Sequence, residues 1–75
     1  MHDRIVIDPQ ICHGKPTIRG TRVPVSIVLG SLAGGMTAKE VEHEYRLAEA
    51  DVRAALEYAA GLVEEEQHHP LPVGP

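Results

Sequence analysis

Residues 17–32 read TIRGTRVPVSIVLGSL, and the hydrophobic period of the chain changes inside this stretch. Before Pro24, apolar and polar residues alternate, and Arg19-Gly20 is a connection of hairpin length in which Gly20 supplies the positive φ of a tight turn. After Pro24, the apolar residues recur at the i, i+3, i+4, i+7 spacing of one helix face: Val25, Val28, Leu29 and Leu32. The stretch therefore predicts a hairpin with strands at 17–18 and 21–23 that leads directly into a helix.

The flanking segments extend this pattern in both directions. Ile5-Val6-Ile7 is a β-branched run that stops at the turn-forming pair Asp8-Pro9, so it predicts a further strand. Gly34-Gly35 suits the end of the first helix, and Thr37 with Glu40 forms a capping box that opens a second. Apolar residues on one face predict a third helix: Val52, Ala55, Leu56 and Ala59. The predicted fold is α+β, a short N-terminal hairpin followed by a three-helix, helix-turn-helix-like unit.

The length of 75 residues allows one domain, which we assign to residues 1–67. Residues 68–75 contain three prolines, and we predict that this tail is disordered. The chain has no Phe and no Trp, so its core must be aliphatic. A small core of this kind gains stability from a second subunit, and we therefore expect a homodimer.

The cysteine content and the hydropathy pattern restrict the cellular setting. A single cysteine excludes an intramolecular disulfide and a multi-cysteine zinc site. The sequence has neither a membrane-spanning apolar run of about 20 residues nor a secretory leader. We therefore expect a cytoplasmic protein with no membrane association.

Charge is distributed unevenly along the chain. Residues 1–22 hold four Lys and Arg against two Asp, a net of +2, whereas residues 23–75 hold three against nine acids, a net of −6. The predicted third helix is itself acidic, so phosphates would repel it from the major groove. If the protein binds DNA, the better candidate for the contact is therefore the basic arm, through Lys15, Arg19 and Arg22. The alternative is that these three cations only solvate a strand edge.

No group of residues predicts catalysis. Gly14-Lys15-Pro16-Thr17 lacks the hydroxyl residue and the preceding glycine of a phosphate-binding loop. An enzyme that used Asp8, Cys12, His13 and Lys15 would lack a third group to orient the nucleophile and base. His68-His69 is not a preformed metal site, because it lies in the proline-rich tail. We therefore predict no catalytic residue, no cofactor and no bound metal.

Three stretches of the sequence carry a resemblance to a known family. They are residues 4–9, residues 12–25, which read CHGKPTIRGTRVPV, and scattered positions between Gly34 and Ala59. Together they closely resemble the "domain of unknown function 433" family over residues 4 to about 62. The segment from Gly14 to Pro24 is the most specific part.

This resemblance implies a winged or homeodomain-like helix-turn-helix protein that acts as the antitoxin of a type II toxin–antitoxin pair. The implied partner is a PIN-like nuclease, and contact with operator DNA is implied as well. The acidic residues expected to dock on a basic nuclease are Glu57, Glu64, Glu65 and Glu66. One departure concerns Ala48, which stands where a Ser or Thr N-cap is expected, at a cost of about 1 kcal/mol. The alternative function is a small homodimeric protein-interaction module that binds no nucleic acid.

Overall fold

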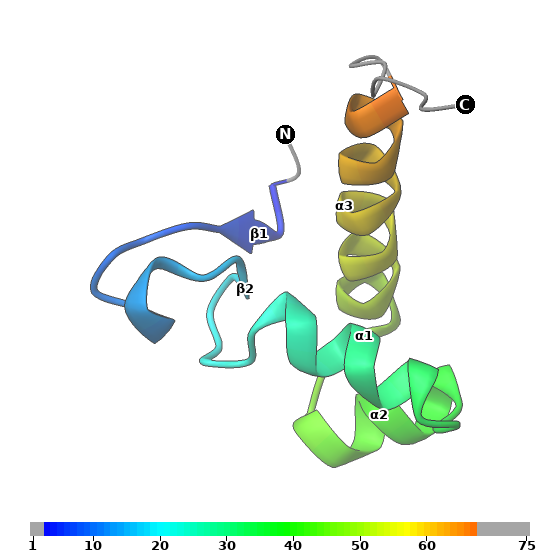
Figure 1. Cartoon of the computed structure of the whole chain (residues 1–75). Coiled ribbons are helices and arrows are strands. Elements are labelled where there is room, and N and C mark those ends of the chain that lie inside the picture. The colour runs from blue at the N-terminus through cyan, green and yellow to red at the C-terminus, as the bar shows by residue number, and fades with distance from the viewer. Residues whose placement is uncertain (1–2, 68–75) are drawn as a thin grey trace.

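The computed structural model of the chain describes residues 3–67 (Figure 1). Strand β1 (Ile5–Val6) is followed by a short 3-10 turn, η1 (Cys12–Gly14), and by strand β2 (Thr17–Ile18). Helices α1 (Val25–Ala33), α2 (Ala38–Tyr45) and α3 (Glu49–Gln67) complete the described part. A two-stranded antiparallel hairpin followed by three helices confirms the predicted α+β class. The predicted disordered tail, residues 68–75, lies outside the described residues.

The strand pairing differs from the predicted hairpin. β2 pairs with β1, with Ile5 opposite Ile18, and residues 21–23 form no strand. The predicted turn is present, because Thr21 N donates to Ile18 O at 3.1 Å and Gly20 has a φ of 79°. The Thr21 hydroxyl donates to Ile18 O at 2.7 Å and accepts from Val23 N at 3.0 Å. Ile18 N also donates to Val23 O at 3.0 Å, and Thr17 forms an isolated antiparallel bridge with Pro24, so the chain after the turn returns beside β2 without forming a strand of its own.

The core is aliphatic, as predicted. Its buried members come from the hairpin, the three helices and the segment between α2 and α3: Ile5, Ile18, Val25, Val28, Val41, Leu47, Val52, Ala54 and Ala55. Leu56 was expected on the core face of the third helix, and this expectation is wrong, because Leu56 is 48% exposed. Successive helix residues turn by about 100°, so Leu56 falls at the edge of the buried stripe and Ala54 takes its place. The small alanines let α3 approach its neighbours closely.

The start of α2 is capped as the sequence predicts, and at the start of α3 a different residue provides the cap. The Thr37–Glu40 capping box is complete, with bonds of 2.8 and 3.1 Å. At the start of α3, Ala48 offers no capping side chain, but Asp51 Oδ2 accepts from Ala48 N at 2.9 Å. Asp51 thus supplies one half of a capping box, which offsets part of the expected loss. Its other oxygen, Oδ1, accepts from Arg4 at 2.9 Å and ties the N-terminal arm to α3.

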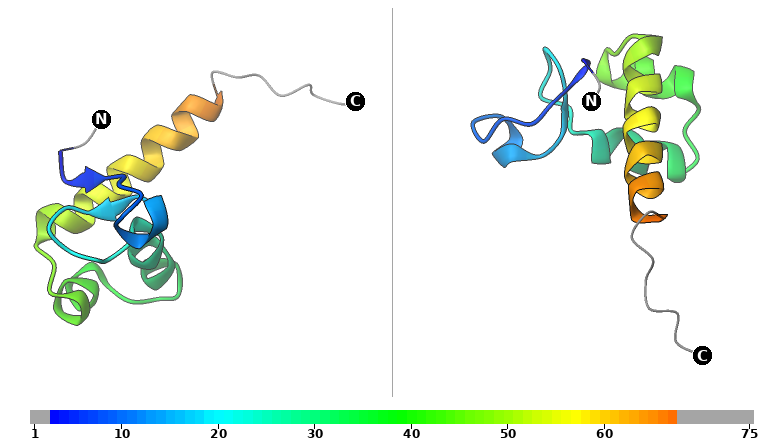
Figure 2. Two further views of the ribbon diagram at one scale, coloured as in Figure 1. Left: turned by 90° about the vertical axis from the view of Figure 1, so that its left-hand side faces the viewer. Right: turned by 90° about the horizontal axis from the view of Figure 1, so that it is seen from above.

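α3 is the longest element, and only its first half is covered by the rest of the molecule. β1, α1 and α2 pack against it, whereas its C-terminal turns extend past the other elements (Figure 2). Every residue from Ala60 to Glu65 is exposed. The second half of α3 is therefore a surface feature and not part of the core.

Candidate interaction surfaces

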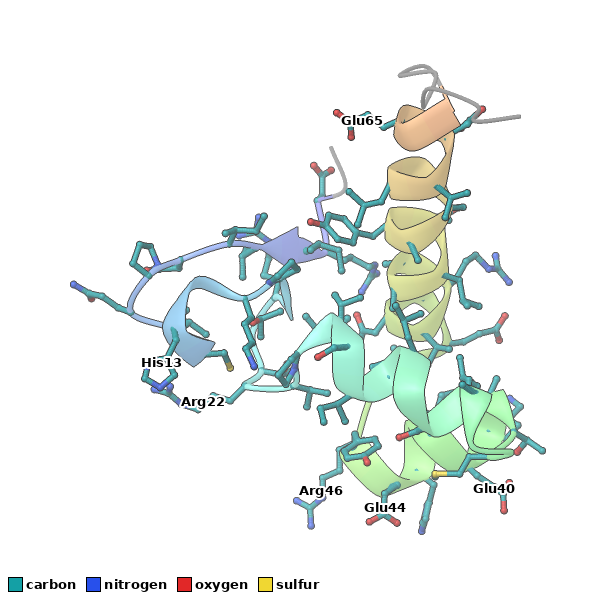
Figure 3. All side chains as sticks on the ribbon, viewed as in Figure 1. His13, Arg22, Glu40, Glu44, Arg46 and Glu65 are labelled. Atoms are coloured by element: carbon teal, nitrogen blue, oxygen red, sulfur yellow. The ribbon has the colours of Figure 1, made fainter. Side chains whose placement is uncertain are left out.

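The three cations of the arm are all exposed, but they lie in different surroundings. Arg19 borders a hollow that is lined by residues 5–9 and Tyr58, and its Nε donates to the Asp3 carbonyl at 2.6 Å. Lys15 borders a second hollow, between α1 and the second half of α3. Arg22 lies at the outer tip of the arm, away from α3 (Figure 3). No described carboxylate forms an ion pair with any of the three cations.

A strained turn determines the shape of this tip. Three consecutive residues, Cys12, His13 and Gly14, have φ angles of 51°, 56° and 81°. The turn is held by Lys15 N, which donates to Cys12 O at 3.1 Å, and by the Cys12 thiol, which donates to Arg22 O at 3.4 Å. A left-handed conformation costs about 1–3 kcal/mol at a residue other than glycine, so the surrounding contacts must impose it. The sequence contains no Asn or Asp in the turn that would have indicated this conformation.

The same turn contains Cys12, the single cysteine of the sequence. Cys12 is half-buried and its thiol is hydrogen-bonded to a carbonyl, so it serves to fasten the turn. Within residues 3–67, no three His, Cys, Asp or Glu side chains are placed to hold a metal ion. His68 and His69 lie outside the described residues. No helix of residues 3–67 is both long and apolar enough to cross a membrane.

The projecting half of α3 has two different faces. Tyr58, Leu62 and Glu65 follow i, i+4, i+7 spacing and share the face that borders the hairpin, and Figure 3 shows Glu65 on the side of α3 where β1 lies. Leu56 and Val63 are seven residues apart and lie on the opposite side of the helix, which we call the outer face. They are 48% and 55% exposed. Leu56 belongs to the covered half of α3, where it lines a hollow with Ala38 and Glu42 of α2.

The predicted partner-binding acids divide between these two faces. Glu57 and Glu64 are exposed at the edge of the outer face, about 100° around α3 from Leu56 and Val63, whereas Glu65 is exposed on the hairpin side. The side chain of Glu66 is not among those described. The structure therefore does not gather the predicted acids into one cluster, because residues one apart on a helix point about 100° from each other.

The first half of α3 presents no uncompensated positive charge. Arg53 forms an i, i+4 ion pair with Glu49 at 2.8 Å, and both side chains are about two-thirds exposed. Asp51 and Glu49 add negative charge to the first turn. A face of this kind repels phosphates, as the charge distribution of the sequence indicates.

Comparison with known proteins places the chain in a family. The profile described as "Protein of unknown function (DUF433)" matches residues 5–59. The chain belongs to the DUF433 family. The match covers the hairpin, α1, α2 and the first half of α3, and it ends where α3 leaves the body of the molecule.

Two solved structures resemble this DUF433 chain. A DUF433 member protein from Anabaena variabilis is 30% identical, with a TM-score of 0.76, and the match covers 91% of this chain and 68% of that one. Rv2018 from Mycobacterium tuberculosis is 36% identical, with a TM-score of 0.63, over 69% of this chain and 24% of that one. The DUF433 chain thus spans about a quarter of the Rv2018 chain. No curated protein matches it.

Proposed function

We propose that this DUF433 protein is the antitoxin of a type II toxin–antitoxin pair and neutralises a PIN-like nuclease. The observation that carries the proposal is the outer face of α3. Val63 is 55% exposed on the projecting half of α3, and Leu56, two turns earlier beside α2, is 48% exposed. Glu57 and Glu64 are exposed at the edge of the same face, about 100° around the helix. An apolar centre with a charged rim is the usual composition of a protein-binding surface.

The charge of this face fits a nuclease partner. A nuclease that binds polyanionic RNA needs cations around its active site, and exposed carboxylates on α3 would be attracted to them. The strongly negative body, −6 over residues 23–75, supports the same pairing. The family resemblance names the class of partner, and the structure supplies a surface of suitable chemistry.

Operator DNA is the second proposed ligand, and the arm is its binding surface. Lys15 and Arg22 are exposed and have no hydrogen-bonded or ion-paired side-chain partner among the described residues, so both are available to phosphates. Arg19 is also exposed but already donates one N–H to Asp3 O. Both proposed ligands place the protein in the cytoplasm, and we expect it to act there as a homodimer.

The nuclease proposal predicts that a gene beside that of this chain encodes a PIN-like nuclease, and the purified product of that gene is used for the test. A titration of the nuclease with the wild-type protein is expected to abolish RNA cleavage at a stoichiometric ratio. Glu64→Lys reverses a charge on the outer face and is expected to weaken inhibition at least about tenfold, since close charge pairs contribute strongly at interfaces. Glu44→Lys is the matched control, because Glu44 is an exposed acid on α2.

Two outcomes would contradict the proposal. Either RNA cleavage continues in an excess of the wild-type protein, or Glu44→Lys weakens inhibition as much as Glu64→Lys. If the protein binds the nuclease but no fragment of the upstream DNA at low salt, the alternative of an interaction module without nucleic-acid binding is favoured.

A further inference from the structure

An apolar groove runs between the hairpin and the second half of α3. It consists of two open hollows, of about 450 and 350 Å³, that meet at Tyr58. Residues 5–9 line the first hollow. The second is lined by apolar residues of the arm, α1 and α3: Pro16, Val25, Leu29, Ala59 and Leu62. The groove lies on the side of α3 that borders the hairpin, so it is separate from the outer face.

Apolar side chains are exposed where the groove opens. Ile7 is 61% exposed in the first hollow, and Leu62 is 47% exposed in the second. Exposed apolar residues that gather around a groove, unlike scattered ones, mark an interaction site. A small molecule buries most of its surface in its site, which two open hollows do not allow. The groove therefore suits a segment of a protein.

The charged groups at the groove are mainly positive. Arg19 lines the first hollow and Lys15 the second, and neither cation forms an ion pair with a described carboxylate. Among the described lining residues the one carboxylate is that of Asp8, and its Oδ1 already accepts from Gln10 N at 2.8 Å. The groove is thus a positive site on a chain whose net charge is −4.

We propose that this groove binds an acidic amphipathic helix of a partner protein. The apolar side chains of that helix lie on Tyr58 and Leu62, and the carboxylates on its flanks meet Lys15 and Arg19. Complementary charge of this kind attracts the correct partner and fixes its orientation. An apolar floor between two cations therefore selects a segment that is both apolar and acidic.

The walls of the groove favour a helix over an extended segment. α1 and α3 wall the second hollow, and their backbone groups bond within each helix. The second hollow therefore offers side chains and no strand edge, as in the recognition of an amphipathic helix by a groove. Operator DNA would satisfy the two cations but leave the apolar floor uncovered. The proposal goes beyond the nuclease and the DNA contacts and depends on neither.

Three synthetic peptides test the proposal on the full chain. Each is a capped helix of about 18 residues, a length at which an isolated helix can form. The first carries leucine at i, i+3, i+4, i+7 and glutamate on both flanks; the second has lysine in place of glutamate, and the third has serine in place of leucine. The first is expected to bind at least about tenfold more tightly than either of the others, as measured by isothermal titration calorimetry. The net charge of the chain by itself favours the lysine peptide, so this preference reports the local charge of the groove.

Charge reversal tests whether the two cations cause this preference. Lys15→Glu/Arg19→Glu is expected to reverse it, so that the lysine peptide binds more tightly than the glutamate peptide. Lys39→Glu/Arg53→Glu is the matched control, because it changes the net charge by the same amount beside the hollow between α2 and α3. This control is expected to keep the preference for the glutamate peptide. Thermal melts verify that both variants are folded.

The apolar floor is tested by two neutral substitutions. Leu62→Ser is expected to weaken binding of the glutamate peptide at least about tenfold, as a central interface residue does. Ile27→Ser is the matched control, because Ile27 is 43% exposed on α1 and lines neither hollow. It is expected to change the affinity less than about threefold.

Four results would overturn the proposal. Three come from calorimetry: a glutamate peptide that binds no more tightly than either control peptide, an unchanged preference in Lys15→Glu/Arg19→Glu, or equal effects of Leu62→Ser and Ile27→Ser. The fourth comes from sedimentation equilibrium of the free chain, because a dimer that Leu62→Ser converts into a monomer would place a second copy in the groove. No nuclease and no DNA enter these assays, so their outcome is independent of the antitoxin proposal.

Discussion

At the scale of single residues, backbone conformation explains much of the N-terminal half. Gly20 has a φ of 79° in the turn between β2 and the α1 connection, and no atom lies within 4 Å of the position that a Cβ would occupy. Space is therefore available for a side chain, and only the dihedral angle favours glycine. Cys12 and His13 adopt similar angles without being glycine, so their turn depends on its hydrogen bonds.

Gly20→Val is expected to destabilise the fold by about 1–3 kcal/mol, because a β-branched residue is poorly accommodated at positive φ. Gly20→Asn is expected to cost less than half as much, since Asn tolerates the left-handed region. Thermal or urea unfolding of the two variants measures the difference. Equal losses from Val and Asn would show that a clash, and not φ, determines the preference for glycine.

At the scale of elements, acidic side chains cap the starts of α2 and α3. The two Thr37–Glu40 hydrogen bonds lower the pKa of Glu40 from its ordinary value of 4.5, with the backbone N–H of Thr37 as the larger cause. At the start of α3, Asp51 combines a cap on Ala48 with the ion pair to Arg4. One carboxylate therefore stabilises a helix end and also attaches the hairpin to the helices.

The lowered pKa of Glu40 gives a pH dependence with a defined sign. A carboxylate whose pKa is depressed on folding stabilises the native state above its unfolded pKa, and this stability is lost as pH falls through the folded value. Glu40→Gln preserves a capping side chain but cannot titrate. Its melting temperature is therefore expected to fall less steeply than that of the wild type below a pH of about 4.5. Glu44→Gln, on the same helix, is the control, and an equal flattening by this variant would contradict the assignment.

Asp51→Ala is expected to destabilise the protein by about 1–2 kcal/mol, because it removes a helix cap and one partner of a partly buried pair. Glu49→Ala, two residues earlier, removes a largely exposed i, i+4 pair and is expected to cost at most about 0.5 kcal/mol. Urea unfolding of Asp51→Ala and Glu49→Ala measures these costs, and the cycle of Arg4→Ala, Asp51→Ala and Arg4→Ala/Asp51→Ala measures the coupling between Arg4 and Asp51. If Glu49→Ala proved as costly as Asp51→Ala, the capping role of Asp51 would be wrong.

At the scale of the whole molecule, the two proposed binding surfaces are separated by position. Arg22 at the tip of the arm and the projecting end of α3 lie far apart (Figure 3), so the proposed DNA contact and the proposed nuclease contact use different residues. If the protein is a homodimer, as we expect, it presents two arms. This doubling affects how DNA binding responds to salt.

If the arm binds operator DNA, the affinity is expected to fall with salt at a slope of about −0.9 for each neutralised phosphate. Two copies of Lys15 and Arg22 offer four contacts, so their share of the slope is about −3.6. Lys15→Ala/Arg22→Ala is expected to remove this share, whereas Arg53→Ala is expected to leave the slope unchanged because Glu49 already pairs with Arg53. Fluorescence anisotropy at several salt concentrations measures the slopes. A large loss of affinity from Arg53→Ala alone would place α3, and not the arm, on the DNA.

The features that the sequence by itself determined are local ones. The Gly20 turn, the Thr37–Glu40 box and the start of a helix after Pro24 depend on backbone preferences and hydrogen bonds over a few residues. The aliphatic character of the core follows from composition alone. Such signals are readable because the interacting groups are neighbours in the chain.

Only the tertiary structure decided which segments meet. The strand partner of β2 is β1, while only one bond to Val23 and a bridge to Pro24 remain of the predicted pairing. Asp51 reaches an Arg that lies 47 positions earlier, and Leu56 is 48% exposed while Ala54 is buried. The same holds for the groove, which joins residues near position 7 to residues near position 60 through Tyr58. Periodicity places a residue on a face of its own element, but the partner of that face depends on how distant elements pack. That packing determines which side of α3 borders the hairpin and which side faces away from it.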